Sequence, residues 1–334
     1  RPSSRGAAPG EGGRGRGRGA DGGKQGGRSW KGGAKGKKGS EQHLAGSGGP
    51  DSGAGRINRE IAELSGADEV LALCEAKLSE FDFVNMATAL HRVAKSVEAR
   101  AWKDDRRLAT LVRHVHGALA SDAVWKKPRH ISNTAWAVSR LQLKDPPLLD
   151  SIAAAAIATI AAFEPHSIAS LAWAVATLRM DNAPLLDALA SAAIPTSSAF
   201  DTRGLSNTAW ACATLRFGNR PLLHSIAASA MLKMCEFDEQ ALSTTFWSFA
   251  KLGFHDQPLI DALSAEAKNR MPYFHQQGLA NLAWSMAKLQ IWNVPLLQAL
   301  SASALARIES MQAQHMSNTA WAFAKLQWKD GPLM

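Results

Sequence analysis

The apolar and polar positions of the chain recur with a period of 37 residues from about residue 130 to the end. Tryptophan, proline and leucine each return six times at this spacing. The positions are Trp136, Trp173, Trp210, Trp247, Trp284 and Trp321; Pro147, Pro184, Pro221, Pro258, Pro295 and Pro332; and Leu141, Leu178, Leu215, Leu252, Leu289 and Leu326. Chance does not align three residue types six times, so the pattern indicates a tandem repeat.

Each repeat predicts two helices. The first is a run of small residues around the tryptophan, as in LSNTAWACATL from about Leu205 to Leu215. The second begins at the proline, and its apolar residues follow helical spacing. Two residues before every proline stands an Asp or Asn, whose side chain can accept hydrogen bonds from the N–H groups of the first turn. These are Asp145, Asn182, Asn219, Asp256, Asn293 and Asp330.

The large apolar side chains predict how the units pack. An aromatic residue closes the second helix in four copies, and Met311 replaces it in the fifth; the four are Phe163, Phe200, Phe237 and Phe274. We expect these residues and the tryptophans to be buried between neighbouring units, because no single repeat can bury its own apolar face. The fold class is therefore all-α: an α-solenoid of 37-residue helix-pair repeats, without strands, in one right-handed superhelical row.

The residues before the array deviate from the pattern. Asp68–Phe81 predicts a helix, and Asn85–Val93 is a degenerate first helix in which Thr88 replaces the tryptophan. A charged stretch, Lys95–Arg107, precedes the second helix near Leu108. We therefore expect three parts: a basic Gly/Arg-rich tail (1–55), atypical leading helical repeats (56–128), and a repeat array (129–334) of six repeats with the last truncated.

The positive charge of the chain lies mostly in the tail. Residues 1–55 hold 20 of the 27 glycines, 11 of the 38 Lys and Arg, and 4 of the 29 Asp and Glu, which gives +7 there and +2 in the rest. Such a segment cannot bury enough apolar surface to fold, so we expect a disordered tail. Its GRGRGRG run contains Arg14, Arg16 and Arg18, and it resembles the arginine-glycine segments of RNA-binding proteins, which neutralise phosphates. A solubilising linker is the alternative.

Two polar columns run through the first helices, seven residues or about two turns apart, and so share one helical face. The first polar column is Asn133, Ser170, Asn207, Thr244, Asn281 and Asn318. The second polar column is Arg140, Thr177, Thr214, Lys251, Lys288 and Lys325. Only Ala or Ser lies between them, which predicts a smooth ribbon edged by hydrogen-bonding groups and cations. Base edges and phosphates of a single RNA strand suit such a surface. Alternatively, the Asn residues cap or cross-link helices and the cations are merely solvated.

No catalytic site, metal site or cofactor is expected. The three cysteines are far apart, which excludes a disulfide framework and a zinc spacing and favours a reducing compartment. The histidines and carboxylates form no recurrent catalytic order. No apolar run of about 18 residues predicts a membrane span. The chain begins with Arg1 and stops just after a helix start, so we expect it to be a fragment at both ends.

The NTAWAxAxL and D/N-x-PLL motifs, over about residues 81–334, make the array similar to octotricopeptide and heptatricopeptide repeats. It also resembles the helical region of FAST-kinase-like proteins that carry a RAP domain. The resemblance implies a non-enzymatic protein that binds single-stranded RNA, either organellar transcripts or rRNA, in the mitochondrial matrix or, alternatively, the chloroplast. Its implied roles are RNA processing, stability or translation, with ribonucleoprotein partners. The rival function is a protein-binding scaffold of the armadillo or HEAT type.

Overall fold

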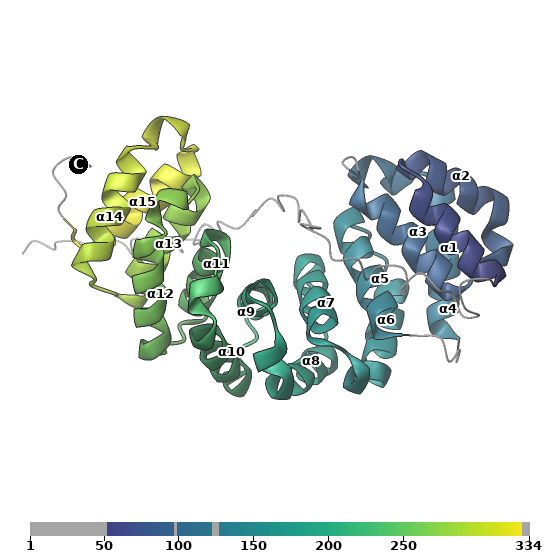
Figure 1. Ribbon diagram of the computed structural model, residues 1–334, viewed down its shortest axis with the longest axis horizontal. Helices are drawn as coiled ribbons and strands as arrows, with labels where there is room; N and C mark the ends of the chain where they lie inside the picture. Colours follow the sequence, from purple (N-terminus) through teal and green to yellow (C-terminus); the bar gives the residue numbers. More distant parts are fainter. Residues whose placement is uncertain (1–51, 97–98, 122–126, 329–334) are drawn as a thin grey trace, which may run out of the picture. The chain divides into compact units, whose positions relative to one another are not determined.

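A computed structural model describes residues 52–96, 99–121 and 127–328 (Figure 1). Over these residues the chain forms fifteen α-helices and several short 3-10 turns, without a strand. The expected all-α class is therefore confirmed. No helix in the described ranges is long and apolar enough to cross a membrane.

The repeat array consists of consecutive helix pairs. The first helices are α5 (Pro128–Leu141), α7 (Pro165–Leu178), α9 (Thr202–Leu215), α11 (Glu239–Leu252), α13 (Gln276–Leu289) and α15 (Ala313–Lys325). The second helices are α6 (Pro146–Thr159), α8 (Ala183–Thr196), α10 (Arg220–Leu232), α12 (Gln257–Asn269) and α14 (Val294–Leu305). Each first helix packs against the first helices before and after it, and the second helices form a parallel layer of their own. Two layers of stacked pairs are the architecture of an α-solenoid.

The second helices have the predicted N-caps, and they begin one residue before the repeat proline. In every described repeat the Asp or Asn is the N-cap, and its side-chain oxygen accepts a hydrogen bond from the backbone N–H three residues on. The donor–acceptor distances are 3.2 Å for Asp145, 3.0 Å for Asn182 and Asn219, and 3.1 Å for Asp256 and Asn293. Asp330 lies outside the described residues. Each cap satisfies a first-turn donor that has no partner within its own helix.

The first helices end in a left-handed residue. In each unit this residue has φ between 52° and 63°; the six are Gln142, Arg179, Arg216, Gly253, Gln290 and Gln327. The next residue is apolar, and its N–H donates to the carbonyl five residues back, as from Leu143 to Val138 at 3.0 Å and from Phe217 to Cys212 at 2.8 Å. This Schellman arrangement closes the helix and turns the chain towards the second helix.

The first helices approach each other through their small residues. The Ala/Ser column between the two polar columns is almost fully buried in all six units: Ala137, Ala174, Ala211, Ser248, Ser285 and Ala322. Small side chains permit a short distance between helix axes. The residues that close the second helices, Phe163, Phe200, Phe237, Phe274 and Met311, are also buried, as expected.

The tryptophan column is less buried than expected. Trp136 is only 4% exposed, whereas Trp173, Trp210, Trp247 and Trp284 are half-buried. Trp321 is 46% exposed, because no described unit follows it. Neighbouring indoles lie against each other, with ring centroids 6.5 Å apart for Trp173 and Trp210 and 6.3 Å apart for Trp247 and Trp284. The column therefore does lie between units, but part of each indole reaches the surface.

A cation at the end of the second helix joins successive units. Lys233 Nζ donates to the carbonyls of Ser198 (2.8 Å) and Phe200 (2.6 Å) in the unit before it. Arg270 donates to Cys235 and Arg307 to Pro272 in the same way, each at 2.7 Å. The three cations are 37 residues apart, and we call them the inter-unit cations. Their partners are carbonyls of the segments around the 3-10 turns that close the preceding second helices.

The leading region consists of α1 (Gly53–Glu63), α2 (Ala67–Lys77), α3 (Phe83–Lys95) and α4 (Arg106–Ala120), with short 3-10 turns at Leu78–Glu80 and Ala99–Asp104. Helix α3 packs against α5 and so continues the row of first helices, while α4 packs against α6. Helix α1 was not expected, and it begins inside the range 1–55. The rest of the expected tail lies outside the described residues.

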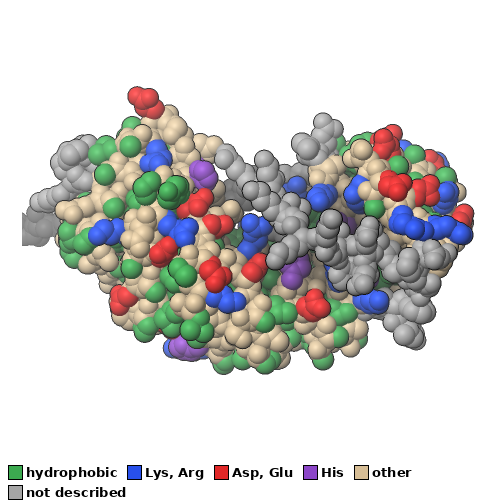
Figure 2. All heavy atoms as spheres, viewed as in Figure 1, with side chains coloured by type: hydrophobic (Ala, Val, Ile, Leu, Met, Phe, Trp, Pro, Cys, Tyr) green, Lys and Arg blue, Asp and Glu red, His purple; other side chains and the backbone are tan. Residues whose placement is uncertain are grey.

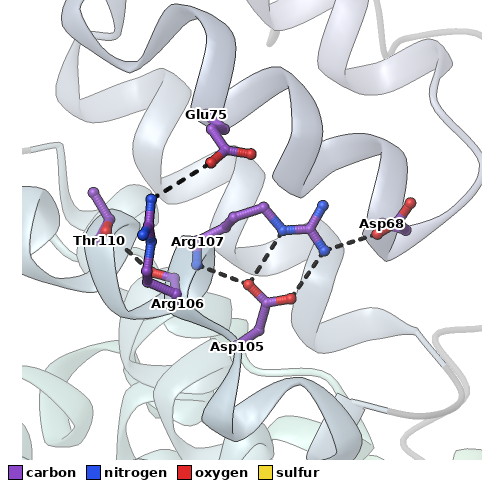
Figure 3. A network of polar contacts seen from close by, with 6 residues as sticks. All are labelled: Asp68, Glu75, Asp105, Arg106, Arg107 and Thr110. Carbon is purple, nitrogen blue, oxygen red and sulfur yellow. Dashed lines mark hydrogen bonds and ion pairs between the residues drawn. The ribbon is translucent and has the colours of Figure 1, made fainter.

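An ion-pair network fastens α4 to α2 (Figure 3). The guanidinium of Arg107 lies 2.8 Å from Asp68 and 2.9 Å from Asp105, which is also the N-cap of α4. The hydrogen bond from Arg107 lowers the pKa of the Asp105 carboxyl, and the two carboxylates raise the pKa of Arg107. Arg107 belongs to the charged stretch noted in the sequence, so that stretch has a structural role.

Candidate nucleic-acid interface

The first polar column lies along the middle of the first helices, and all six of its side chains are half-buried. The side-chain amides of Asn133, Asn207, Asn281 and Asn318 make no hydrogen bond to any described residue. The hydroxyls of Ser170 and Thr244 likewise have no described partner. A row of solvent-accessible donors and acceptors on adjacent helices can therefore meet a ligand without breaking an internal contact.

The matching asparagine of the leading region behaves differently. Asn85 is fully buried, its Nδ2 donates to the Ala54 carbonyl at 2.9 Å, and its Oδ1 accepts from the Asp82 N–H at 3.1 Å. Arg92, which matches Arg140, donates to the Leu64 carbonyl. In the leading region the two columns thus hold α1 and its surroundings in place. In the array, the side chains of the first polar column have no described partner of this kind.

The second polar column varies along the array. Lys251, Lys288 and Lys325 are exposed, and Lys251 Nζ lies 5.6 Å from the centroid of the Trp247 ring. Arg140 is half-buried, with its guanidinium carbon 5.9 Å from the Trp136 centroid. Thr177 donates its hydroxyl to the Trp173 carbonyl at 2.8 Å, which occupies that donor within its own helix. The cationic edge is thus strongest in the last three units.

The expected smooth ribbon between the columns is wrong. The Ala/Ser column is buried where the first helices meet, so it offers no surface to a ligand. The tryptophan, three residues after the first polar column and four before the second, shares their face instead. On the accessible face of each unit, the residue of the first polar column therefore comes first. The partly exposed indole follows it, and the residue of the second polar column comes last. The periodicity of the sequence shows which residues share a helix face, but it does not show which of them stay exposed once neighbouring helices pack.

A further exposed column lies one turn before the first polar column and was not singled out from the sequence. It contains three basic or imidazole residues followed by three glutamines: Arg129, His166, Arg203, Gln240, Gln277 and Gln314. The recurrence of these polar residues every 37 positions is the sequence signal that could have identified the column. The polar face of each first helix is therefore longer than expected by about one turn. The tail residues Arg14, Arg16 and Arg18 lie outside the described residues.

Two thiols and two imidazoles among the described residues are kept uncharged at neutral pH by burial. No group of three or more His, Cys, Asp or Glu among them could hold a metal ion. Burial raises the pKa of the Cys74 and Cys212 thiols to about 12, so neither is a thiolate at neutral pH. Burial lowers the pKa of His91 and of His130 to about 4, which keeps both imidazoles neutral. The two histidines lie on α3 and α5, which pack together, and the His91 ring centroid lies 4.8 Å from that of Trp136.

The surface charges are mixed. Figure 2 shows Lys and Arg side chains interspersed with Asp and Glu across the face in view. The face in view therefore carries no uniform basic surface. Exposed lysines do recur at the ends of the first helices in the last three units.

Comparison with known proteins gives a family-model match over the array and a similar curated protein. A family model described as RNA-editing substrate-binding complex 6 protein matches residues 122–228 and again residues 216–331. A RAP domain-containing chloroplast protein of Oryza sativa subsp. japonica is 34% identical over an alignment of 122 residues, with coverage of 32% of this chain and 19% of that protein. The chain thus spans less than a fifth of the length of this curated relative.

Proposed function

Because the chain belongs to the RNA-editing substrate-binding complex 6 protein family, we propose that its row of first helices binds single-stranded RNA sequence-selectively in an organelle. The protein acts without catalysis, in RNA processing, stability or translation. The observation that carries the proposal is the first polar column: half-buried amides and hydroxyls on adjacent helices, largely without internal partners, beside a cationic edge. Organellar transcripts and rRNA are the substrates that this function implies.

The division of labour follows from the chemistry of the two columns. Amides such as those of Asn207 and Asn281 both donate and accept, so they can distinguish base edges. Lysines at the end of the helix are point charges that attract phosphates without regard to sequence. The partly exposed indoles between them provide apolar surface for a base. By analogy with repeat proteins that read one base per unit, each full unit contacts about one nucleotide.

The test measures affinity for an unstructured oligouridylate of about twelve nucleotides at several salt concentrations. Replacing Lys251, Lys288 and Lys325 by Ala should weaken binding and reduce the slope of log K against log salt by about 2, since each phosphate contact on a single strand contributes about 0.7. The matched control replaces Lys103, Arg106 and Lys268 by Ala. These cations are also exposed but lie off the first-helix row, so the slope should stay unchanged.

Two results would contradict the proposal. One is a wild-type protein without measurable RNA affinity at physiological salt that instead captures only protein partners, which would favour a scaffold of the armadillo or HEAT type. The other is equal loss of binding in the test and control variants, which would mean that net charge alone matters. Imaging of the tagged full-length protein decides between the mitochondrial matrix and the chloroplast.

A further inference from the structure

The left-handed residues that end the first helices are cationic in the units where the second polar column has no cation. In the units where the column has a cation, the left-handed residue two positions later is Gln or Gly. In the two units where the column has a threonine, Thr177 and Thr214, the left-handed residue is an arginine, Arg179 or Arg216. Each of the six units therefore has one cation at these two positions.

Both arginines are free to meet a ligand. Arg179 and Arg216 are exposed, and neither forms an ion pair or a side-chain hydrogen bond with a described residue. Asp181, the nearest carboxylate in sequence to Arg179, forms no ion pair with it in the described structure. The two side chains therefore have no described internal partner to account for their presence.

The backbone gives no reason for arginine at these positions. Their φ values are 55° and 57°, a region in which a side chain is strained and glycine is favoured. The equivalent residue in the fourth unit is Gly253, with φ 63° and open space around its Cα, so glycine fits this turn. Arginine occupies the left-handed position only in the two units whose second-column residue is uncharged. This distribution points to selection for the charge rather than for the backbone conformation.

We propose that the six cations form one phosphate-contacting row across the whole array, which we call the cationic row: Arg140, Arg179, Arg216, Lys251, Lys288 and Lys325. The inference rests on the proposed RNA binding and extends it from the last three units to all six. The RNA backbone then follows the carboxyl ends of successive first helices, one cation per unit. Arg179 and Arg216 are binding residues of the second and third units.

The alternative is that a cation at this place only complements the negative end of the helix dipole. That role also gives one cation per unit, but it predicts a loss of thermal stability rather than of RNA affinity. Glycine separates the two roles, because it removes the charge and relieves the strained backbone at once.

The experiment compares three variants of the full chain for binding to the same oligouridylate. Replacing Arg179 and Arg216 by Gln should weaken binding about tenfold at 0.15 M salt and reduce the salt slope by about 1.4, the contribution of two single-strand phosphate contacts. The Gly versions should lose the same affinity while keeping or raising the melting temperature.

The third variant moves the charge: Thr177→Lys with Arg179→Gln, and Thr214→Lys with Arg216→Gln. Lysine occupies the equivalent column positions in the last three units, so the fold accepts it, and affinity should return to within about twofold of the wild type.

Three outcomes overturn the inference. If the Gln variant binds like the wild type while the Lys251, Lys288 and Lys325 variant is weakened, the row covers only the last three units and the proposed function stands. If the Gly variants unfold at lower temperature and the moved charge does not restore affinity, the arginines support the helix ends. If the wild type does not bind RNA, both the inference and the proposed function are wrong.

Discussion

Asn85 and Asn281 occupy matching places on their helices but have different surroundings. Asn85 is buried and bonded to two backbone groups, whereas the amide of Asn281 is half-buried and bonds to no described residue. A buried amide whose partners are lost costs stability, but an accessible amide without internal partners costs little when removed. The same residue type therefore holds the fold together in the leading region and remains available to a ligand in the array.

This contrast predicts opposite phenotypes. Asn281→Ala should leave the melting temperature nearly unchanged and alter which base is preferred at one position, by about 1–3 kcal/mol if a good base contact is lost. Asn85→Ala should lower the free energy of unfolding by about 1–2 kcal/mol and leave base preference alone. Thermal melts and selection from a randomised RNA pool on both proteins test this. A destabilised Asn281→Ala protein with unchanged preference would remove the first polar column from the interface.

At the level of helices, the features set by local chemistry could be predicted. The start of each second helix follows from the Asx–proline pair because cap and proline act within one turn. The end of a first helix at about Leu215 was also predicted, but the left-handed residues that follow could not be, since only Gly253 among the six is a conventional signal. Helix α1 was missed because its sequence opens with glycines and alanine. The partial exposure of the tryptophans depends on how closely neighbouring helices approach, which no single unit encodes.

The role of the inter-unit cations could not be predicted either, because a cation that recurs every 37 residues can contact a phosphate or a backbone carbonyl. Lys233→Ala and Arg307→Ala should each lower the free energy of unfolding by about 1 kcal/mol, because each loses hydrogen bonds to carbonyls of the preceding unit. Urea titration measures the loss, and Lys268→Ala, an exposed cation on α12 with no described partner, is the control. The RNA salt slope should remain that of the wild type. A changed slope would place these cations at the interface instead.

At the scale of the whole described structure, two histidines with pKa values lowered by burial make the junction between the leading helices and the array sensitive to acid. His91 on α3 and His130 on α5 are held neutral there, chiefly by burial, with positive neighbours including Arg129 contributing and Asp82 opposing for His130. Their pKa of about 4 lies below the usual 6.5 of an unfolded histidine. The unfolded chain therefore binds more protons between these values, so stability is complete above about pH 6.5 and falls as the pH drops towards 4.

Between pH 7 and pH 5, each histidine should reduce the free energy of unfolding by about 2 kcal/mol. His91→Gln should show roughly half of the pH dependence of the wild type, and His255→Gln, which changes an exposed residue, should show all of it. Urea unfolding at the two pH values gives the comparison. Equal pH dependence in all three proteins would mean that the junction does not govern acid sensitivity.

The bonds that join the units also bear on how such a gene can change. Each inter-unit cation reaches back 33 to 35 residues, to the unit just before its own. Duplicating or deleting a block of 37 codons would therefore keep each of the three cations at the same sequence distance from the carbonyls of the unit before it. A block of 36 codons would break the contacts across one boundary. Changes of array length in whole units would thus keep these contacts, and under the proposed function the length of RNA bound would change in the same steps.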